Sequence, residues 1–121
     1  MLENFKRGAN ENMSKYHNKK IQIDMYVFDS IAESRRYKEL ALLEKAGKIS
    51  NLKLQPRFLL QEGFKKNGKT YRKIEYIADF RYIENDKIVV EDVKGKETEA
   101  FKLKHKLFEY HYPQYELKII K

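Results

Sequence analysis

An acidic and a basic side chain stand two residues apart near the end of an apolar run. In IVVEDVKG (residues 88–95), Asp92 and Lys94 share one face of a predicted β-strand with Ile88 and Val90, because alternate side chains of a strand point the same way. A carboxylate beside an ammonium group can hold a divalent cation and orient a water molecule, as phosphodiester hydrolysis requires. The alternative is a same-face ion pair on an exposed strand.

A second carboxylate lies in the apolar segment before this strand. Asp79 belongs to the run IADF (residues 77–80), where an unpaired charge is costly to bury. A hairpin with its turn at residues 84–87 would bring Asp79 near Asp92, and two converging carboxylates suit Mg²⁺ or Mn²⁺. The alternative is a salt bridge from Asp79 to Arg81 or to a lysine of the partner strand.

Glu33 is the third candidate carboxylate. It precedes Leu40 by seven residues, so the two side chains lie only about 20° apart around a helix, and Glu33 is in line with the apolar stripe. Ser30 and Glu33 also have the spacing of a capping box. Glu33 therefore supports a site at the edge of the core, bonds back to Ser30, or does both.

Several lysines are candidate phosphate contacts. Lys104 shares a predicted helix face with Phe101 and Phe108, so its ammonium group either reaches a phosphate near the metal or extends to water while its stem packs on the sheet. Four further lysines are candidates whose other interpretation is a solvated face: Lys19, Lys20, Lys102 and Lys106.

Two helices are predicted to flank these segments. The first begins near Ser30 and ends at Ala46 and Gly47, a natural position for glycine after a helix. The second extends from about Thr98 to His111 and is stopped by Pro113.

The predicted strands complete an αβββαβ order, a mixed central sheet flanked by helices. Residues 20–28 form a short strand or an extended arm. The other predicted elements are a first strand from Lys53 to Leu60 interrupted by Pro56, a turn at Asn67 to Lys69, an antiparallel hairpin of residues 71–83 and 88–93, and a closing strand from Tyr115 to Ile120.

Composition narrows the class of protein. The 121 residues suit one domain, expected over residues 16–121 after a flexible tail at residues 1–15. A net charge of +8 favours a nucleic-acid partner, although a lysine-rich composition also serves solubility. With no Cys and three scattered His, any metal would have oxygen ligands. No apolar run is long enough for a membrane span or a signal peptide, so we expect a cytoplasmic protein.

Four blocks of the sequence carry a resemblance to a known family. They are FDSIAESRRYKELALLEKAGKISNLKLQPRF (residues 28–58), YIADFRY (76–82), VVEDVKG (89–95) and KLKHKLFEYHYP (102–113). Together they resemble a family of small phage-encoded proteins, formerly of unknown function, that is similar to a branch of the PD-(D/E)XK nucleases. The likeness covers about residues 16–121.

The resemblance implies a restriction-endonuclease-like core and a set of site residues. It assigns the first acid to Glu33, the second to Asp79, and the acid-X-Lys triplet to Asp92, Val93 and Lys94. The chain departs from the family pattern in having Ala78 where the name motif has Pro, and Asp rather than Glu in the triplet. Neither departure removes a ligand. Gln55 matches a polar position of related branches.

These observations favour a Mg²⁺-dependent endonuclease acting on DNA. Asp79, Asp92 and the Val93 carbonyl would hold the metal, with Glu33 acting directly or through water, and Lys94 would orient the attacking water. The phage likeness favours branched or replicating DNA, as for a junction resolvase.

Two alternatives and two further expectations accompany this one. The first alternative is a non-catalytic nucleic-acid-binding protein on the same fold, and the second is a structural subunit of a replication or packaging assembly. We expect no small-molecule substrate. Symmetric cleavage of two strands would be easiest for a homodimer, the commonest assembly of small proteins.

Overall fold

The computed structural model describes residues 20–121, and the predicted tail at residues 1–15 and Lys19 lie outside them. Backbone contacts divide the chain into two units that meet in sequence between Leu43 and Glu44, and each is described by itself. The single domain expected over residues 16–121 stays a prediction.

The first unit contains a hairpin followed by most of a helix. Strands β1 (Ile21–Ile23) and β2 (Tyr26–Phe28) pair antiparallel around Asp24 and Met25, which have positive φ angles of 51° and 73°. The short strand or extended arm predicted for residues 20–28 is thus a hairpin. These two residues in the left-handed conformation reverse the chain. The alternation of polar and apolar residues in the sequence does not by itself predict this reversal.

Helix α3 (Ile31–Lys45) follows the predicted limits. It begins after Ser30, whose Oγ accepts a hydrogen bond from the Glu33 amide at 3.0 Å, one half of the predicted capping box. Its last two residues belong to the second unit. The helix ends before Gly47, whose φ of +79° is a conformation that glycine adopts without strain and whose amide donates to the Glu44 carbonyl.

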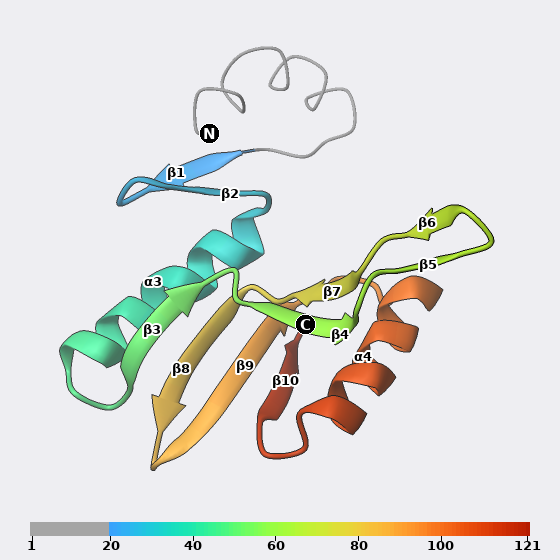
Figure 1. The fold of residues 1–121 in the computed structure, drawn as a ribbon. Helices are drawn as coiled ribbons and strands as arrows, with labels where there is room; N and C mark the ends of the chain where they lie inside the picture. The colour runs from blue at the N-terminus through green and yellow to red at the C-terminus, as the bar shows by residue number, and fades with distance from the viewer. Residues whose placement is uncertain (1–19) are drawn as a thin grey trace. The chain divides into compact units, whose positions relative to one another are not determined.

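A four-stranded mixed sheet forms the centre of the second unit. Its strands β3 (Ser50–Leu54), β8 (Phe80–Glu84), β9 (Lys87–Val93) and β10 (Glu116–Ile120) lie side by side in the order β10-β9-β8-β3 (Figure 1). Strand β10 pairs parallel with β9, and the other two pairings are antiparallel. With α4 (Glu99–His111) between β9 and β10, these strands and the two helices follow the predicted αβββαβ order along the chain.

The interruption predicted at Pro56 is confirmed, whereas the strand predicted as continuous over residues 71–83 is broken, so this second prediction is wrong in that respect. The segment from Lys53 to Leu60 divides into β3 and β4 (Arg57–Gln61), and residues 71–83 divide into the end of a hairpin, β7 (Ile74–Ile77) and β8. Strands β4 and β7 pair antiparallel with each other.

The two breaks lie opposite each other and have one cause. Gln55 has a positive φ of 53°, and Pro56 has no amide hydrogen to donate. Backbone pairing nevertheless continues across the break, because the Gln55 amide donates to the Asp79 carbonyl and the Ala78 amide to the Pro56 carbonyl, at 2.9 and 3.1 Å. The β4–β7 pair is therefore a bent extension of the β3–β8 pair, with Asp79 at the bend.

Tight turns close the two other hairpins as predicted. Strands β5 (Phe64–Lys66) and β6 (Lys69–Tyr71) are joined through Asn67 and Gly68, with φ angles of 52° and 76°. Asn85 and Asp86, at 53° and 64°, join β8 to β9. Two consecutive positive φ angles match the right-handed twist of a hairpin, and Asn, Asp and Gly are the residues that tolerate them best.

The core of the second unit lies between α4 and strands of the sheet. Thr98 caps the helix by accepting a hydrogen bond from the Phe101 amide at 3.1 Å, and the helix ends at His111, two residues before Pro113. Phe101 and Phe108 on the inner face of α4 pack against residues of β4, β7 and β9. The buried cluster consists of Phe58, Leu60, Tyr76, Ala78, Val90, Phe101 and Phe108.

None of the helices within residues 20–121 combines the length and the apolar character that crossing a bilayer demands.

Candidate active site

Asp92 and Lys94 lie on the same side of β9, as the strand period predicts. The Asp92 side chain is buried, and the Lys94 Nζ atom is 3.5 Å from its Oδ1 atom. The two residues therefore do form an ion pair, but β9 is a buried strand and not the exposed strand of the alternative interpretation. Glu91 points to the opposite face, where Tyr82 donates a hydrogen bond to it.

Asp79 lies beside this pair because of the bend between β7 and β8. Its amide donates to the Glu91 carbonyl at 3.0 Å, and its Oδ2 atom accepts a hydrogen bond from the Val93 amide at 2.7 Å. The side chain of Asp79 is thus fixed at the backbone between Asp92 and Lys94. The β8–β9 hairpin has brought the second acid to the triplet, as its turn predicts.

Tyr76 is a member of the site that sequence reasoning missed. It is buried on β7, and its hydroxyl donates to the Asp92 Oδ2 atom at 2.5 Å. Burial raises the pKa of Tyr76 far above its usual range, and the hydrogen bond to Asp92 and the negative charges of Asp92 and Asp79 raise it further. Tyr76 therefore keeps its proton and remains a donor to Asp92.

A signal for Tyr76 was present in the sequence. A buried tyrosine needs a partner for its hydroxyl, and Tyr76 stands in an apolar strand only three residues before Asp79. The partner itself, Asp92, is far away in sequence and depends on how the strands pair.

A pocket of about 260 Å³ opens next to the pair. Lys94 and Lys104 both line it, and the Lys94 Nζ atom lies 4.6 Å from the centre of the Phe101 ring, within reach of a cation–π interaction. Thr98, the cap of α4, is another lining residue, so the amide end of the helix also faces this region. The pocket is lined by Tyr76, Ile77, Lys94, Thr98, Ala100, Phe101 and Lys104.

The other predicted phosphate contacts lie in different environments. Lys102 is exposed and pairs with Glu99 at 3.5 Å, and Lys106 is exposed on the same helix. Gln55 is exposed, and its backbone amide holds the Asp79 carbonyl. Lys20 belongs to the first unit and pairs with Asp29.

Glu33 belongs to the first unit, where it is buried near the start of α3. Asp79, Asp92, Lys94 and Lys104 all belong to the second unit. The structure brings Asp79, Asp92 and Lys94 together, and it places Lys104 in the pocket with Lys94. The role of Glu33 stays a prediction.

The donor atoms of the site suit a hard divalent cation. Among residues 20–121, no group of three or more His, Cys, Asp or Glu side chains is arranged to share a metal ion. Mg²⁺ commonly takes one or two carboxylates and completes its coordination shell with water, so two carboxylates form a sufficient protein contribution. Tyr76 and the Val93 amide hold one oxygen of Asp92 and one of Asp79, which fixes the direction of both carboxylates.

Comparison of the chain with curated proteins, and with solved structures, gave no match. A family model, by contrast, matches residues 13–121 and so includes every residue of the site. On this match, the chain belongs to the family described as "Protein of unknown function (DUF1064)".

Proposed function

We propose that the protein is a metal-dependent endodeoxyribonuclease built on a restriction-endonuclease-like core. The observation that carries the proposal is the meeting of Asp79, Asp92 and Lys94, with Asp79 bonded to the Val93 amide and Lys94 3.5 Å from Asp92. These residues occupy the positions of the second acid and of the acid-X-Lys triplet. The αβββαβ order of the mixed sheet and helices is the order that such a core requires.

Asp79, Asp92 and the Val93 carbonyl would hold Mg²⁺ or Mn²⁺, and Glu33 would support them directly or through water. The cation, when bound, supplies Lewis-acid stabilisation of the negative charge that develops on a phosphate. The chain's own contribution begins with Tyr76, which keeps Asp92 oriented by donating to its Oδ2 atom.

Lys94 provides the second contribution. Its ammonium group lies against Asp92 and over the Phe101 ring, at the wall of a pocket that could receive the scissile phosphate. From there it would orient the attacking water and offset charge on the phosphate, while Lys104 in the same pocket would hold a neighbouring phosphate. Branched or replicating DNA is the proposed substrate.

The test is cleavage of a panel of linear, nicked and four-way-junction DNAs in Mg²⁺, compared with the same reactions in a chelator. We expect Asp79→Asn and Asp92→Asn each to lower the rate about a hundredfold or more, because each removes one charge that binds the metal. Both variants should fold, because loss of one of two neighbouring negative charges relieves repulsion.

Glu91→Gln is the matched control. Glu91 is a buried carboxylate on the same strand, but it faces away from Asp92 and accepts a hydrogen bond from Tyr82. It should keep wild-type cleavage if the rate depends on the Asp79 and Asp92 pair. A folded Asp92→Asn protein that cuts as fast as wild type would contradict the assignment.

Binding without any cleavage by the wild-type protein would favour the second candidate, a non-catalytic nucleic-acid-binding protein. The observation that favours this candidate is the strongly basic segment from Gly63 to Lys73, which contains no acidic residue.

A further inference from the structure

The β5–β6 hairpin combines exposed aromatic rings with a local excess of positive charge. Between Gly63 and Lys73 the chain carries five Lys and Arg residues and no Asp or Glu. Phe64 and Tyr71, 46% and 39% exposed, face each other across the two strands. None of the proposed catalytic residues belongs to this segment.

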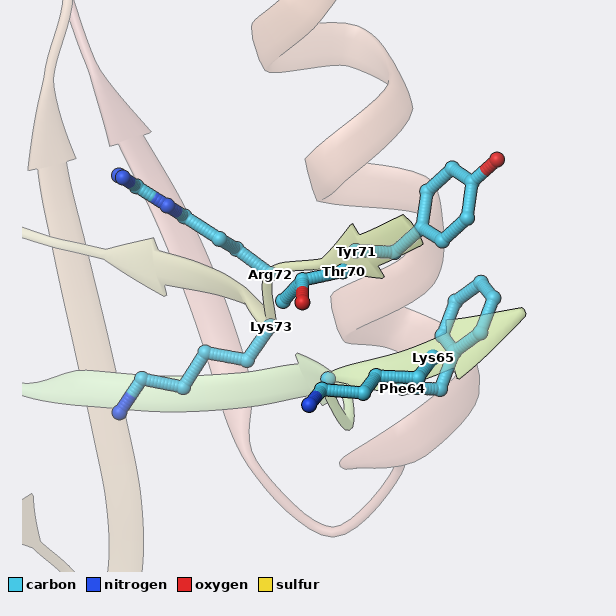
Figure 2. A pocket seen from close by; sticks show the side chains of 7 residues that line it. Phe64, Lys65, Thr70, Tyr71, Arg72 and Lys73 are labelled. Atoms are coloured by element: carbon cyan, nitrogen blue, oxygen red, sulfur yellow. The ribbon is translucent and has the colours of Figure 1, made fainter. Parts of the chain in front are cut away.

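The two rings form a flat stacked pair. Their centroids are 4.8 Å apart and their planes differ by only 11°. Figure 2 shows the labelled Phe64 and Tyr71 side chains next to each other. A cross-strand aromatic pair stabilises a hairpin by itself, and that is the simplest role for these residues. It does not account for the five cations of the segment.

Three of the five cations, Lys65, Lys66 and Lys69, belong to the two strands, and the other two directly follow β6. Lys66 and Lys69 are paired across the strands next to the turn, and the Lys69 Nζ atom lies 5.2 Å from the centre of the Tyr71 ring. Arg72 and Lys73 extend away from the rings in Figure 2. Within residues 20–121, only Lys73 of the five has an acidic partner, Glu75 at 3.5 Å.

The hairpin is also fixed in shape before any partner binds. Asn67 and Gly68 form its two-residue turn, and the backbones of its two strands come close together at its base. A Cβ atom on Gly63 would lie 3.1 Å from the Tyr71 carbonyl oxygen, so glycine permits this approach. Less conformational entropy is then lost on binding than for a flexible basic loop.

We propose that the β5–β6 hairpin is a nucleic-acid-binding arm that engages a DNA strand with unpaired bases. Lys65, Lys66, Lys69 and Arg72 contact phosphates, and an unpaired base stacks on the Phe64–Tyr71 pair. Exposed aromatic faces between cations are the usual platform for single-stranded nucleic acid. The shallow pocket of about 480 Å³ at the hairpin, lined by Phe64, Tyr71 and four of their neighbours as well as Gly63, gives the base a place to lie.

This inference goes beyond the proposed activity, because it concerns binding and not cleavage. The experiment is therefore done in a chelator, where metal-dependent cleavage is absent. If the arm proposal is wrong, the folded arm variants bind DNA as the wild type does, or the wild type does not bind, whereas a failure of the nuclease proposal appears only in the Mg²⁺ cleavage assay.

A single tryptophan reports on the arm. The chain contains no Trp, so Tyr71→Trp introduces one fluorophore at the stacking position. We expect a single-stranded DNA of roughly 20 nucleotides to quench this fluorescence and to protect the indole from acrylamide, because a base stacks on it. A fully paired duplex of the same sequence should have a much smaller effect.

Tyr110→Trp is the matched control for the fluorophore. Tyr110 is 79% exposed on α4 and is not part of the hairpin. The same oligonucleotide should leave its fluorescence nearly unchanged. The proposal would be overturned by equal quenching at both positions or by equal quenching with duplex DNA. It would also be overturned by a fluorescence change that depends on protein concentration and not on DNA, because this would indicate that a second copy of the chain occupies the site.

The fluorescence anisotropy of labelled single-stranded DNA measures how much the arm contributes to the affinity for that DNA. Phe64→Leu with Tyr71→Leu should weaken binding at least about fivefold, and Lys66→Gln with Lys69→Gln should weaken it and reduce its salt dependence. Circular dichroism and thermal unfolding confirm that each protein is folded. Unchanged affinity in both folded double variants, or no binding by the wild type, would refute the arm.

Discussion

Asp92 is held at two points that have different chemical roles. The Tyr76 hydroxyl donates to one oxygen, and the Lys94 ammonium group approaches the other. The first contact orients the carboxylate, and the second couples it to a residue at the wall of the pocket. Single substitutions can therefore separate orientation, charge and phosphate binding.

Lys94 and Lys104 should differ in what they contribute to cleavage. Lys94→Gln should lower the rate at saturating DNA about a hundredfold or more, and change affinity by less than about threefold, because it is one of 26 Lys and Arg residues. Lys104→Gln should weaken binding more than it slows cleavage. Single-turnover rates and equilibrium binding separate the two quantities. Equal losses of rate and affinity in Lys94→Gln would identify it as an ordinary phosphate contact.

Tyr76 should make stability depend on alkaline pH. Because its pKa is raised on folding, the folded state holds the phenolic proton more tightly than the unfolded chain. This contribution to stability is therefore complete below the ordinary tyrosine pKa of about 10 and is lost as the pH rises above it. Tyr76→Phe should flatten the fall in the free energy of unfolding above pH 10, and cost about 1–3 kcal/mol at neutral pH because Asp92 loses a donor.

Urea unfolding from pH 8 to 11 measures this effect. Tyr71→Phe, which removes an exposed hydroxyl, is the control. An alkaline profile of Tyr76→Phe parallel to that of the wild type would contradict the prediction.

The sequence predicted that Asp79 and Asp92 meet, but it did not predict that Tyr76 orients Asp92. Asp79 and Asp92 are conspicuous because charges in apolar strands are costly, and a short turn predicts that they approach each other. Tyr76 looks like any core aromatic until the pairing of the strands places Asp92 against its hydroxyl.

At the scale of helices and strands, sequence patterns predicted correctly those features that depend on residues close together in the chain. Ser30 and Thr98 cap the two helices at the predicted positions, and the two predicted hairpin turns form, with positive φ angles at their central residues. The break between β7 and β8 has no comparable local signal, because it lies opposite the break at Gln55 and Pro56, which is distant in sequence.

This break explains why proline, the residue of the name motif, is disfavoured at position 78. The Ala78 amide donates to the Pro56 carbonyl, and the residue is almost completely buried. Ala78→Pro would restore the residue of the name motif but remove this donor, so we expect it to destabilise the protein by about 1–3 kcal/mol. Urea denaturation measures the change, with Ala78→Gly as the control that keeps the amide and adds no buried polar group. A proline variant as stable as wild type would show that this bond is dispensable.

For the whole molecule, the net charge of +8 predicts binding that weakens steeply with salt. The log–log slope of affinity against salt concentration should be about −0.9 for each phosphate neutralised on duplex DNA. Titrations with Asp92→Asn in a chelator, from low to moderate salt, give the slope. A slope near zero would indicate that the basic surface does not meet the DNA backbone.

The homodimer stays a prediction, since the structure contains one chain. Sedimentation equilibrium with and without DNA decides it. A monomer in both states that still cuts both strands of a duplex would exclude a symmetric pair of active sites.

The parallel pairing of β9 with β10 has a consequence for the order of events during synthesis. The Lys94 amide donates to the Ile120 carbonyl, so the backbone at the proposed catalytic lysine is secured by a residue that the ribosome adds only after all of α4. The β8–β9 hairpin can close earlier, because its partners are joined by two residues. A nascent chain stalled before β10 would thus lack the anchor of the segment around Lys94, so the proposed nuclease activity is expected only after translation of this region is finished.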